Sequence, residues 1–178
     1  TKDSNASDEW NEIVNKSQTM LGVFHSRWCL YLVNLHMIKY PIIPVAQTLI
    51  LSCLNFDFFD VFVSPGSRNV PLAIGFASNK KFKCYSIVDE RSAAFFALGL
   101  SQKSKKPTIL ICTSGSALLN YYPAVAEAYY SEIPLIILSA DRPEYKINIG
   151  DGQTINQSNV FEKNILYSNS LKQDCSHA

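Results

Sequence analysis

The stretch Ile87-Val88-Asp89-Glu90-Arg91-Ser92-Ala93-Ala94 sets three charged residues between two apolar segments. Residues 85–88 have the composition of a strand end, and residues 92–100 have that of a helix that begins immediately afterwards. The carboxylate of Glu90 is therefore predicted to lie at a corner between a strand and a helix. In open α/β sheets, ligands bind at the carboxyl ends of the strands. This position favours a chemical role for Glu90 over a role in solubility.

The alternation of strands and helices continues on both sides of this corner. Apolar runs predict strands at 61–63, 84–88, 108–112 and 135–138, and the segments 45–55, 71–78, 91–102 and 117–130 predict helices. The predicted strands are apolar throughout, as a parallel sheet covered on both faces requires. Short turns between alternating strands and helices predict a three-layer α/β/α domain. After Pro143 the pattern weakens, although residues 161–167 are compatible with one more element.

Composition narrows the class of protein. The 178 residues, 17% charged and 47% hydrophobic, predict one globular domain. A net charge of +1 without a cluster of Lys and Arg argues against a nucleic-acid partner. The apolar stretch 20–38 contains two histidines, an arginine and an asparagine, so it is a poor membrane span. We treat residues 1–38 as an N-terminal extension and hypothesise that Met37 is the native start.

The number and positions of the cysteines and histidines exclude further classes of protein and of functional site. The five cysteines are odd in number and contain no C-x-x-C pair, which predicts reduced, buried thiols in a cytoplasmic protein. Cys84 and Cys112 in particular lie within apolar runs. The three histidines all fall outside residues 40–173. A Ser-His hydrolase or a histidine-ligated zinc centre is therefore not expected in the central domain.

Four loops follow the predicted strands, and a parallel sheet opens them all on one edge. They comprise residues 64–68, 89–91, 113–116 and 139–142. Arg68 and Arg142 suit a bidentate grip on a carboxylate or phosphate. The Ser-Gly-Ser turn that ends at Ser116 precedes a helix, so it leaves backbone N–H groups for an anion or a polar ring edge.

Each of these residues also has an ordinary structural explanation. Arg68 and Arg142 are equally compatible with surface pairs to Asp or Glu. Ser116 is a suitable cap for the helix that follows it. Glu90 also suits an exposed helix N-terminus, where the helix dipole favours acidic residues. The shared edge of the four loops is what favours a functional site.

Five segments, in this order and spacing, resemble the MenD family, the 2-succinyl-5-enolpyruvyl-6-hydroxy-3-cyclohexene-1-carboxylate synthases of menaquinone biosynthesis. They are S-P-G-S-R at 64–68, V-D-E-R-S-A-A-F-F-A-L-G at 88–99, C-T-S-G-S-A at 112–117, N-Y-Y-P-A at 120–124 and S-A-D-R-P at 139–143. The resemblance runs from about residue 39 to residue 167. Thiamine diphosphate enzymes in general share the glutamate, but not S-P-G-S-R together with A-D-R-P.

The resemblance implies that residues 39–178 form the pyrimidine-binding domain of a thiamine diphosphate enzyme, with a flavodoxin-like fold. It implies that Glu90 is catalytic and hydrogen-bonds N1′ of the aminopyrimidine ring. For this role we expect Glu90 to be shielded from water. The resemblance also implies that Pro65, Ser116 and Asn120 shape the pyrimidine pocket.

The resemblance implies the substrates as well. Ser67, Arg68, Arg142 and Gln153 match substrate positions, where the arginines would hold the carboxylates of 2-oxoglutarate and isochorismate. The family decarboxylates the first acid and adds the remaining succinyl semialdehyde unit to the second. This sequence departs from the family at residues 151–152, where Asp-Gly stands in place of a common Ala-Asn. One amide donor is therefore missing.

Enzymes of this family have three domains, and the sequence ends after the first. We therefore expect the diphosphate-binding domain, which holds Mg²⁺ or Mn²⁺ in the family, to be absent, so no metal ligand is predicted here. Gly150-Asp151-Gly152 looks like the start of the diphosphate-metal motif, but no apolar strand precedes it. We expect an inactive fragment of a cytoplasmic, homo-oligomeric transferase. The alternatives are another thiamine diphosphate carboligase and a non-catalytic, flavodoxin-like binding module.

Overall fold

The computed structural model describes residues 41–171, so the hypotheses about Met37 and residues 1–38 lie outside the described residues. Within that range, a parallel four-stranded sheet has the order β2-β1-β3-β4. The strands are β1 (Asp60–Val63), β2 (Lys83–Ser86), β3 (Thr108–Cys112) and β4 (Leu135–Ser139). The helices are α3 (Pro44–Asn55), α4 (Val70–Ala77), α5 (Glu90–Ser104), α6 (Ser116–Leu119) and α7 (Tyr122–Tyr130). Two 3-10 turns, η1 (Glu144–Lys146) and η2 (Glu162–Asn164), follow β4.

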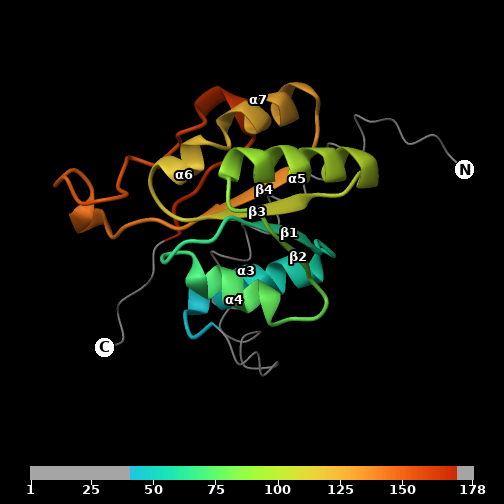
Figure 1. Cartoon of the computed structure of the whole chain (residues 1–178), viewed down its shortest axis with the longest axis horizontal. Coiled ribbons are helices and arrows are strands. Elements are labelled where there is room, and N and C mark those ends of the chain that lie inside the picture. Colours follow the sequence, from blue (N-terminus) through green and yellow to red (C-terminus); the bar gives the residue numbers. More distant parts are fainter. Residues whose placement is uncertain (1–40, 172–178) are drawn as a thin grey trace, which may run out of the picture.

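The helices cover the sheet in two layers, which confirms the predicted α/β/α architecture (Figure 1). Helices α3 and α4 lie on one face, and α5, α6 and α7 lie on the other. Because successive side chains of a strand point to opposite faces, Val61 and Val63 join the core under α3 and α4, whereas Phe62 joins the core under α5 and α7. The residues of β3 divide in the same way, with Ile109 and Ile111 on one side and Leu110 and Cys112 on the other.

Burial is not uniform across the sheet. All residues of β3 are buried, whereas all four residues of β2 are exposed and those of β4 are half-buried. The prediction that every strand is covered on both faces is therefore wrong for β2, which lies at the edge while α5 packs over β1 and β3. Cys84 lies on β2 and is exposed, so its predicted burial is also wrong.

The helix predicted over residues 117–130 is in fact two helices, α6 and α7, separated at Asn120 and Tyr121. Pro123 lies in the first turn of α7. A proline lacks the N–H donor that a helix interior needs, and its ring clashes with the carbonyl four residues earlier. The proline thus prevents one continuous helix. The break leaves Asn120 exposed and Tyr121 fully buried.

Smaller differences concern the ends of elements. Strand β2 ends at Ser86, two residues before the predicted end, and α5 begins at Glu90 rather than at Arg91. Residues 161–167 contain only the short turn η2. None of the helices among residues 41–171 combines the length and the apolar character needed to cross a membrane.

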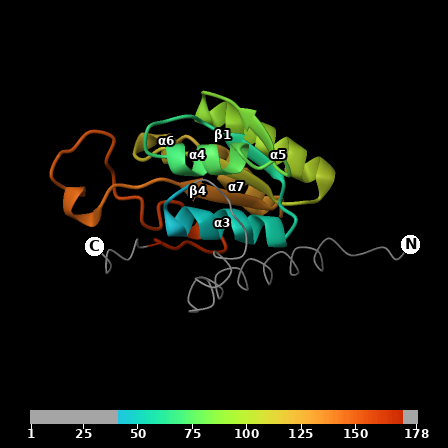
Figure 2. The same cartoon turned by 90° about the horizontal axis from the view of Figure 1, so that it is seen from below.

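The path of the chain selects one edge of the sheet for binding. Helix α4 leads from β1 to β2 along one face, and α5 returns along the other face to β3. Connections therefore leave the neighbouring strands β1 and β3 toward opposite faces. In open α/β sheets, ligands bind at the carboxyl ends of the strands at such a point. The segment after β4 extends beyond this same edge (Figure 2).

The reactivity of the thiols tests which cysteines are buried in this fold. Burial raises the pKa of Cys53 and of Cys112 to about 12, and desolvation also raises the pKa of the exposed Cys84 thiol. The thiolate is the reactive form, so iodoacetamide at about pH 8 should modify Cys84 in the folded chain and spare Cys53 and Cys112. Labelling of Cys84 should accelerate as the pH rises, because the thiolate fraction grows. Peptide mass spectrometry before and after unfolding measures this pattern, and modification of Cys53 in the folded chain would contradict it.

Candidate functional site

The loops after β1 and β3 touch each other at Gly66. A Cβ atom at Gly66 would lie 2.5 Å from Cβ of Thr113, so a larger residue would push the two loops apart. The backbone N–H of Ser64 donates to the carbonyl of Ile111 at 2.9 Å, which continues the ladder between the strands into the loop. The buried side chain of Asn69 donates to the carbonyl of Ser64 at 2.8 Å. The loop is therefore fixed against β3.

Glu90 is the first residue of α5, and its neighbour Asp89 caps the helix. The N–H of Ser92 donates to Oδ1 of Asp89 at 2.7 Å, and hydrogen bonds from Ser92 hold the pKa of Asp89 below its ordinary value. Because Asp89 already caps α5, Glu90 is not required for that role. Instead, Asn120 donates from Nδ2 to Oε2 of Glu90 at 3.4 Å. Glu90 is half-buried, so the predicted shielding from water is incomplete in the described chain.

Buried polar groups lie close to Glu90. Burial raises the pKa of Tyr121 and of Cys112, and the nearby charge of Glu90 acts in the same direction on both. The hydroxyl of Tyr121 lies beside Ser64 and Cys112. The side-chain oxygen of Thr113 has no hydrogen-bond partner within residues 41–171. The charge of Glu90 therefore acts on a buried pair of polar groups, Tyr121 and Cys112.

Arg68 and Gln153 are brought together from opposite ends of the domain. The guanidinium of Arg68 donates to Oε1 of Gln153, and it also approaches the carbonyl of Gly152 at 3.5 Å. These two residues were predicted to bind substrate, and the structure makes them direct neighbours. Pro65 and Ser67 lie in the same loop as Arg68 and are exposed. The side chain of Ser67 makes no hydrogen bond in the part of the chain that the structure describes.

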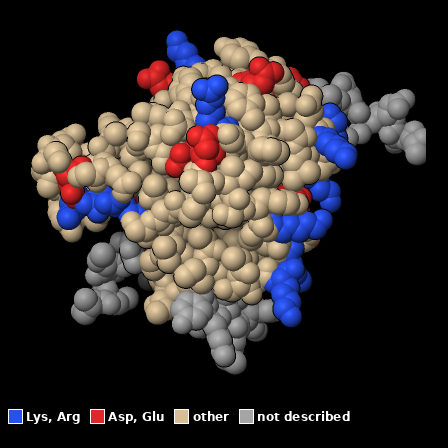
Figure 3. Space-filling view, in the orientation of Figure 1, with Lys and Arg blue, Asp and Glu red and all other residues tan. Residues whose placement is uncertain are grey.

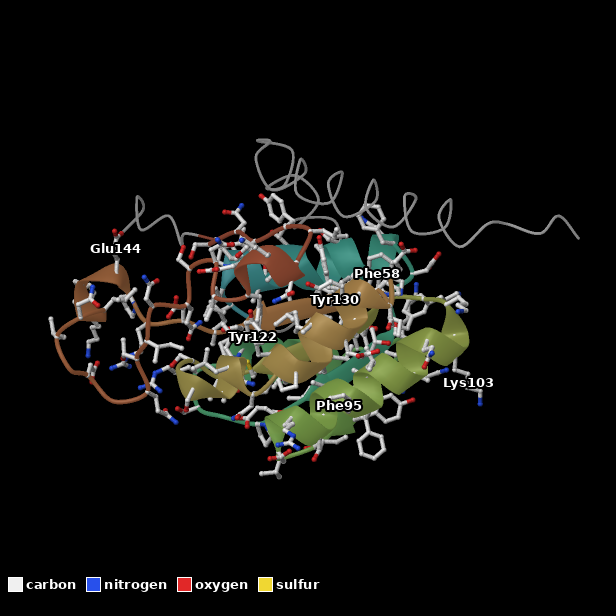
Figure 4. The ribbon with its side chains drawn as sticks, turned by 90° about the horizontal axis from the view of Figure 1, so that it is seen from above. Phe58, Phe95, Lys103, Tyr122, Tyr130 and Glu144 are labelled. Carbon is white, nitrogen blue, oxygen red and sulfur yellow. The ribbon has the colours of Figure 1, made fainter. Side chains whose placement is uncertain are left out.

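Arg142 forms an ion pair with Asp151, and Nζ of Lys146 lies 3.3 Å from the same carboxylate oxygen. This is the surface pairing that was left open as an alternative for Arg142. The three residues belong to the segment that projects beyond the sheet, where basic and acidic side chains adjoin (Figure 3). Turn η1, which carries Glu144, lies on this segment apart from the helices (Figure 4).

Gly150-Asp151-Gly152 lies in the loop that follows turn η1. Asp151 contacts Arg142 and Lys146. No group of three or more His, Cys, Asp or Glu side chains among the described residues is placed to hold a metal ion.

Ser116 does not cap α6, contrary to the prediction. The N-cap is Gly115, whose φ of +86° is in the left-handed region that glycine adopts without strain. A Cβ atom at Gly115 would lie 2.8 Å from the backbone of Gln153, so the close approach also requires glycine. The side chain of Ser116 is exposed and makes no hydrogen bond within the described range. The loop after β3 thus packs directly on the segment that carries Gln153.

Sequence reasoning missed Gln157. Its Oε1 accepts the N–H of Gly115 at 2.7 Å, and its Nε2 donates to Oγ of Ser139 at 2.7 Å and to the carbonyl of Ala140 at 3.0 Å. The N–H of Gly115 was expected to be available to an anion, but this bond to Gln157 occupies it. Gln157 joins the loops after β3 and β4, and Ser114 adds a bond from Oγ to the carbonyl of Gln153 at 2.8 Å. The only signal in the sequence is a pair of glutamines four residues apart in a polar segment.

The chain matches the family model described as "Thiamine pyrophosphate enzyme, N-terminal TPP binding domain" over residues 44–164. It is 61% identical over 137 residues to a protein of Flavobacterium johnsoniae and 65% identical over 133 residues to one of Christiangramia forsetii. Both are named 2-succinyl-5-enolpyruvyl-6-hydroxy-3-cyclohexene-1-carboxylate synthase. The matches confirm the family resemblance that the five motifs predicted.

The two matches cover 77% and 75% of this chain but 25% and 23% of the relatives, so the chain spans about a quarter of their length. Among solved structures, a benzoylformate decarboxylase from Polynucleobacter necessarius is similar, with a TM-score of 0.56 and 25% identity. That similarity covers 62% of this chain and 21% of the decarboxylase. It supports the α/β fold independently of the sequence motifs.

The bonds of Gln157 can be tested by changing its amide to a carboxylate. In Gln157→Glu the side chain can still accept from Gly115, but it can no longer donate to Ser139 and Ala140. We expect the free energy of unfolding to fall by about 2 kcal/mol, because the carbonyl of Ala140 then faces an acceptor. Urea unfolding measures this change.

Asn156→Asp is the matched control for Gln157→Glu. Asn156 is exposed, and its Oδ1 accepts the N–H of Ser158 at 3.2 Å, which a carboxylate can also do. This control should change the free energy of unfolding by less than about 0.5 kcal/mol. Equal losses in the two variants would show that the added charge matters and the bridging bonds of Gln157 do not.

Proposed function

Because this chain belongs to the thiamine pyrophosphate enzymes through its N-terminal TPP binding domain, we propose that it is the pyrimidine-binding part of a 2-succinyl-5-enolpyruvyl-6-hydroxy-3-cyclohexene-1-carboxylate synthase. The complete transferase would decarboxylate 2-oxoglutarate and add the remaining four-carbon unit to isochorismate. The names of the relatives support this reaction. The observation that carries the proposal is Glu90, placed at the binding edge of the sheet beside Asn120.

The groups around Glu90 fit the polar edge of an aminopyrimidine ring. The ring presents nitrogen acceptors and an amino donor, and the site offers a carboxylate, an amide and hydroxyls. The hydroxyl oxygen of Thr113 lacks a partner in the described chain. An unpaired buried polar group costs about 1–3 kcal/mol, so a ligand that pairs with this oxygen gains affinity. Pro65 and Ser116 complete the proposed pocket.

In this proposal Glu90 holds a proton against a ring nitrogen of the cofactor. Asn120 restrains one carboxylate oxygen by its hydrogen bond, and the cap formed by Asp89 fixes the start of α5. When bound, thiamine diphosphate supplies an electron sink for the pair of electrons left when carbon dioxide departs. A neighbouring protein surface must cover Glu90, which is half-buried here, because water weakens such a proton contact.

We further propose that this cover is the diphosphate-binding part of another subunit, in a homo-oligomer. That part would hold Mg²⁺ or Mn²⁺ together with the diphosphate. The free thiols of Cys53, Cys84 and Cys112 are in keeping with a reducing, cytoplasmic location.

The proposed substrates carry carboxylates, and the site has two arginines for them. Arg68 lies beside Gln153 at the base of the projecting segment, and Arg142 lies farther along the chain at the same edge. A guanidinium binds a carboxylate through two parallel N–H groups, which fixes its orientation as well as its charge. We assign substrate binding to Ser67, Arg68, Arg142 and Gln153.

The proposed function can be tested by complementation. The chain is supplied with thiamine diphosphate, Mg²⁺, 2-oxoglutarate and isochorismate, with and without a diphosphate-binding part prepared from a curated relative. We expect the carboligation product in the mixture and none with the chain alone, because each part holds one end of the cofactor. Mass spectrometry of the product is the measurement. Absence of product from a mixture in which both parts are folded and bound to each other would contradict the proposal.

The role of Glu90 can be tested in the same mixture. Glu90→Gln removes the proton-sharing carboxylate with little change of shape, so we expect the rate to fall at least about 100-fold with an unchanged urea unfolding midpoint. The control is Glu127→Gln on α7, where Ser131 donates to Oε1 at 2.8 Å and an amide oxygen can replace the carboxylate. Equal rates for wild type and Glu90→Gln would refute the assigned role.

A further inference from the structure

The ion pair on the projecting segment places a carboxylate of the chain itself on the arginine that we assign to a substrate. Asp151 contacts the guanidinium of Arg142, and the two side chains are only 29% and 16% exposed. An ion pair that is largely covered is less screened by water than one on the open surface. We propose that Asp151 occupies the carboxylate position of Arg142 and must leave it when an acidic substrate binds. This inference rests on the proposed function.

The backbone at Arg142 is held without Asp151. The N–H of Arg142 donates to Oδ1 of Asp141 at 2.7 Å, and the N–H of Ala140 donates to the carbonyl of Cys112 at 3.1 Å. The carbonyl of Ala140 also accepts from Gln157. These bonds fix the stem of Arg142 to the end of the sheet. Asp151 is therefore not needed as a support for this backbone, and its contact with the guanidinium acts on the free end of the side chain.

The surroundings of Asp151 allow it to leave Arg142. Nζ of Lys146 lies 3.3 Å from its carboxylate, so a displaced Asp151 keeps a cation close by. The glycines on either side, Gly150 and Gly152, have no atom within 4 Å of their Cβ positions, so the backbone around Asp151 is uncrowded. Gln157 anchors the later part of the segment to the loops after β3 and β4. A shift of residues 150–152 then gives up the contacts of Arg68 and Thr154 with the carbonyl of Gly152 but leaves that anchor in place.

The guanidinium groups of Arg68 and Arg142 contact different kinds of acceptor, and this difference bears on which ligands can bind. Arg68 contacts an amide oxygen of Gln153 and a backbone carbonyl, which are both neutral acceptors. A charged carboxylate forms a stronger hydrogen bond than a neutral acceptor, so it displaces them readily. Arg142 is already paired with the full negative charge of Asp151. Only a ligand with its own carboxylate competes there, so Asp151 excludes neutral analogues of the substrate.

The test measures binding of 2-oxoglutarate to the full 178-residue chain by calorimetry. Asp151→Asn removes the competing charge with little change of shape. Asp141→Asn is the matched control, because it removes the same negative charge next to Arg142 and retains an acceptor for the backbone N–H. We expect about fivefold tighter binding for Asp151→Asn and less than about twofold for Asp141→Asn, the range that ion pairs of this kind provide.

A further variant tests whether the tighter binding of 2-oxoglutarate by Asp151→Asn depends on Arg142. Arg142→Ala in the Asp151→Asn background should remove the fivefold gain. Equal gains in the two asparagine variants, a gain that survives Arg142→Ala, or no binding by Asp151→Asn would overturn the inference. Weaker binding by Asp151→Asn would overturn it too, because Asp151 would then orient Arg142. Product formation in the complementation assay decides the proposed function separately, since wild-type Asp151 is present there.

Discussion

The parallel pairing of β1 with β3 is the interaction on which the rest of the structure depends. It sets Val61, Phe62 and Val63 opposite Ile109, Leu110 and Ile111, and these six side chains supply the centre of both hydrophobic clusters. The same register brings Gly66 onto Thr113. A shift by one residue would turn each side chain to the opposite face. The core and the binding edge therefore have one common cause.

The order of strands and helices could be predicted because it is encoded locally. The apolar run 108–112 matches β3 at both ends, and the helical period after Pro44 matches α3. The exposure of β2 could not be predicted in this way, because an apolar run does not reveal which strand lies at the edge. The break before α7 was also missed. The apolar pattern continues through it, and only the backbone chemistry of Pro123 separates the two helices.

The residue types of the candidate site could be predicted because loops after parallel strands share an edge. The pairings among them could not. Arg68 meets Gln153 across 85 positions of sequence, and nothing local encodes that contact. The same holds for Gln157, whose partners lie in two other loops. Ser116 has the right side chain for a cap, but the left-handed backbone at Gly115 takes that place.

Strand β2, like β4, is an edge of the described sheet, and such edges are where copies of a chain can pair in concentrated solution. Within the described residues its outer backbone groups have no neighbouring strand, and such an edge is a template for strand addition. A net charge of +1 gives little general repulsion between copies. Lysines at positions 80, 81 and 83 gather at the start of β2, and lysine at an edge opposes pairing. Colloidal stability therefore depends on a few local charges rather than on the overall charge.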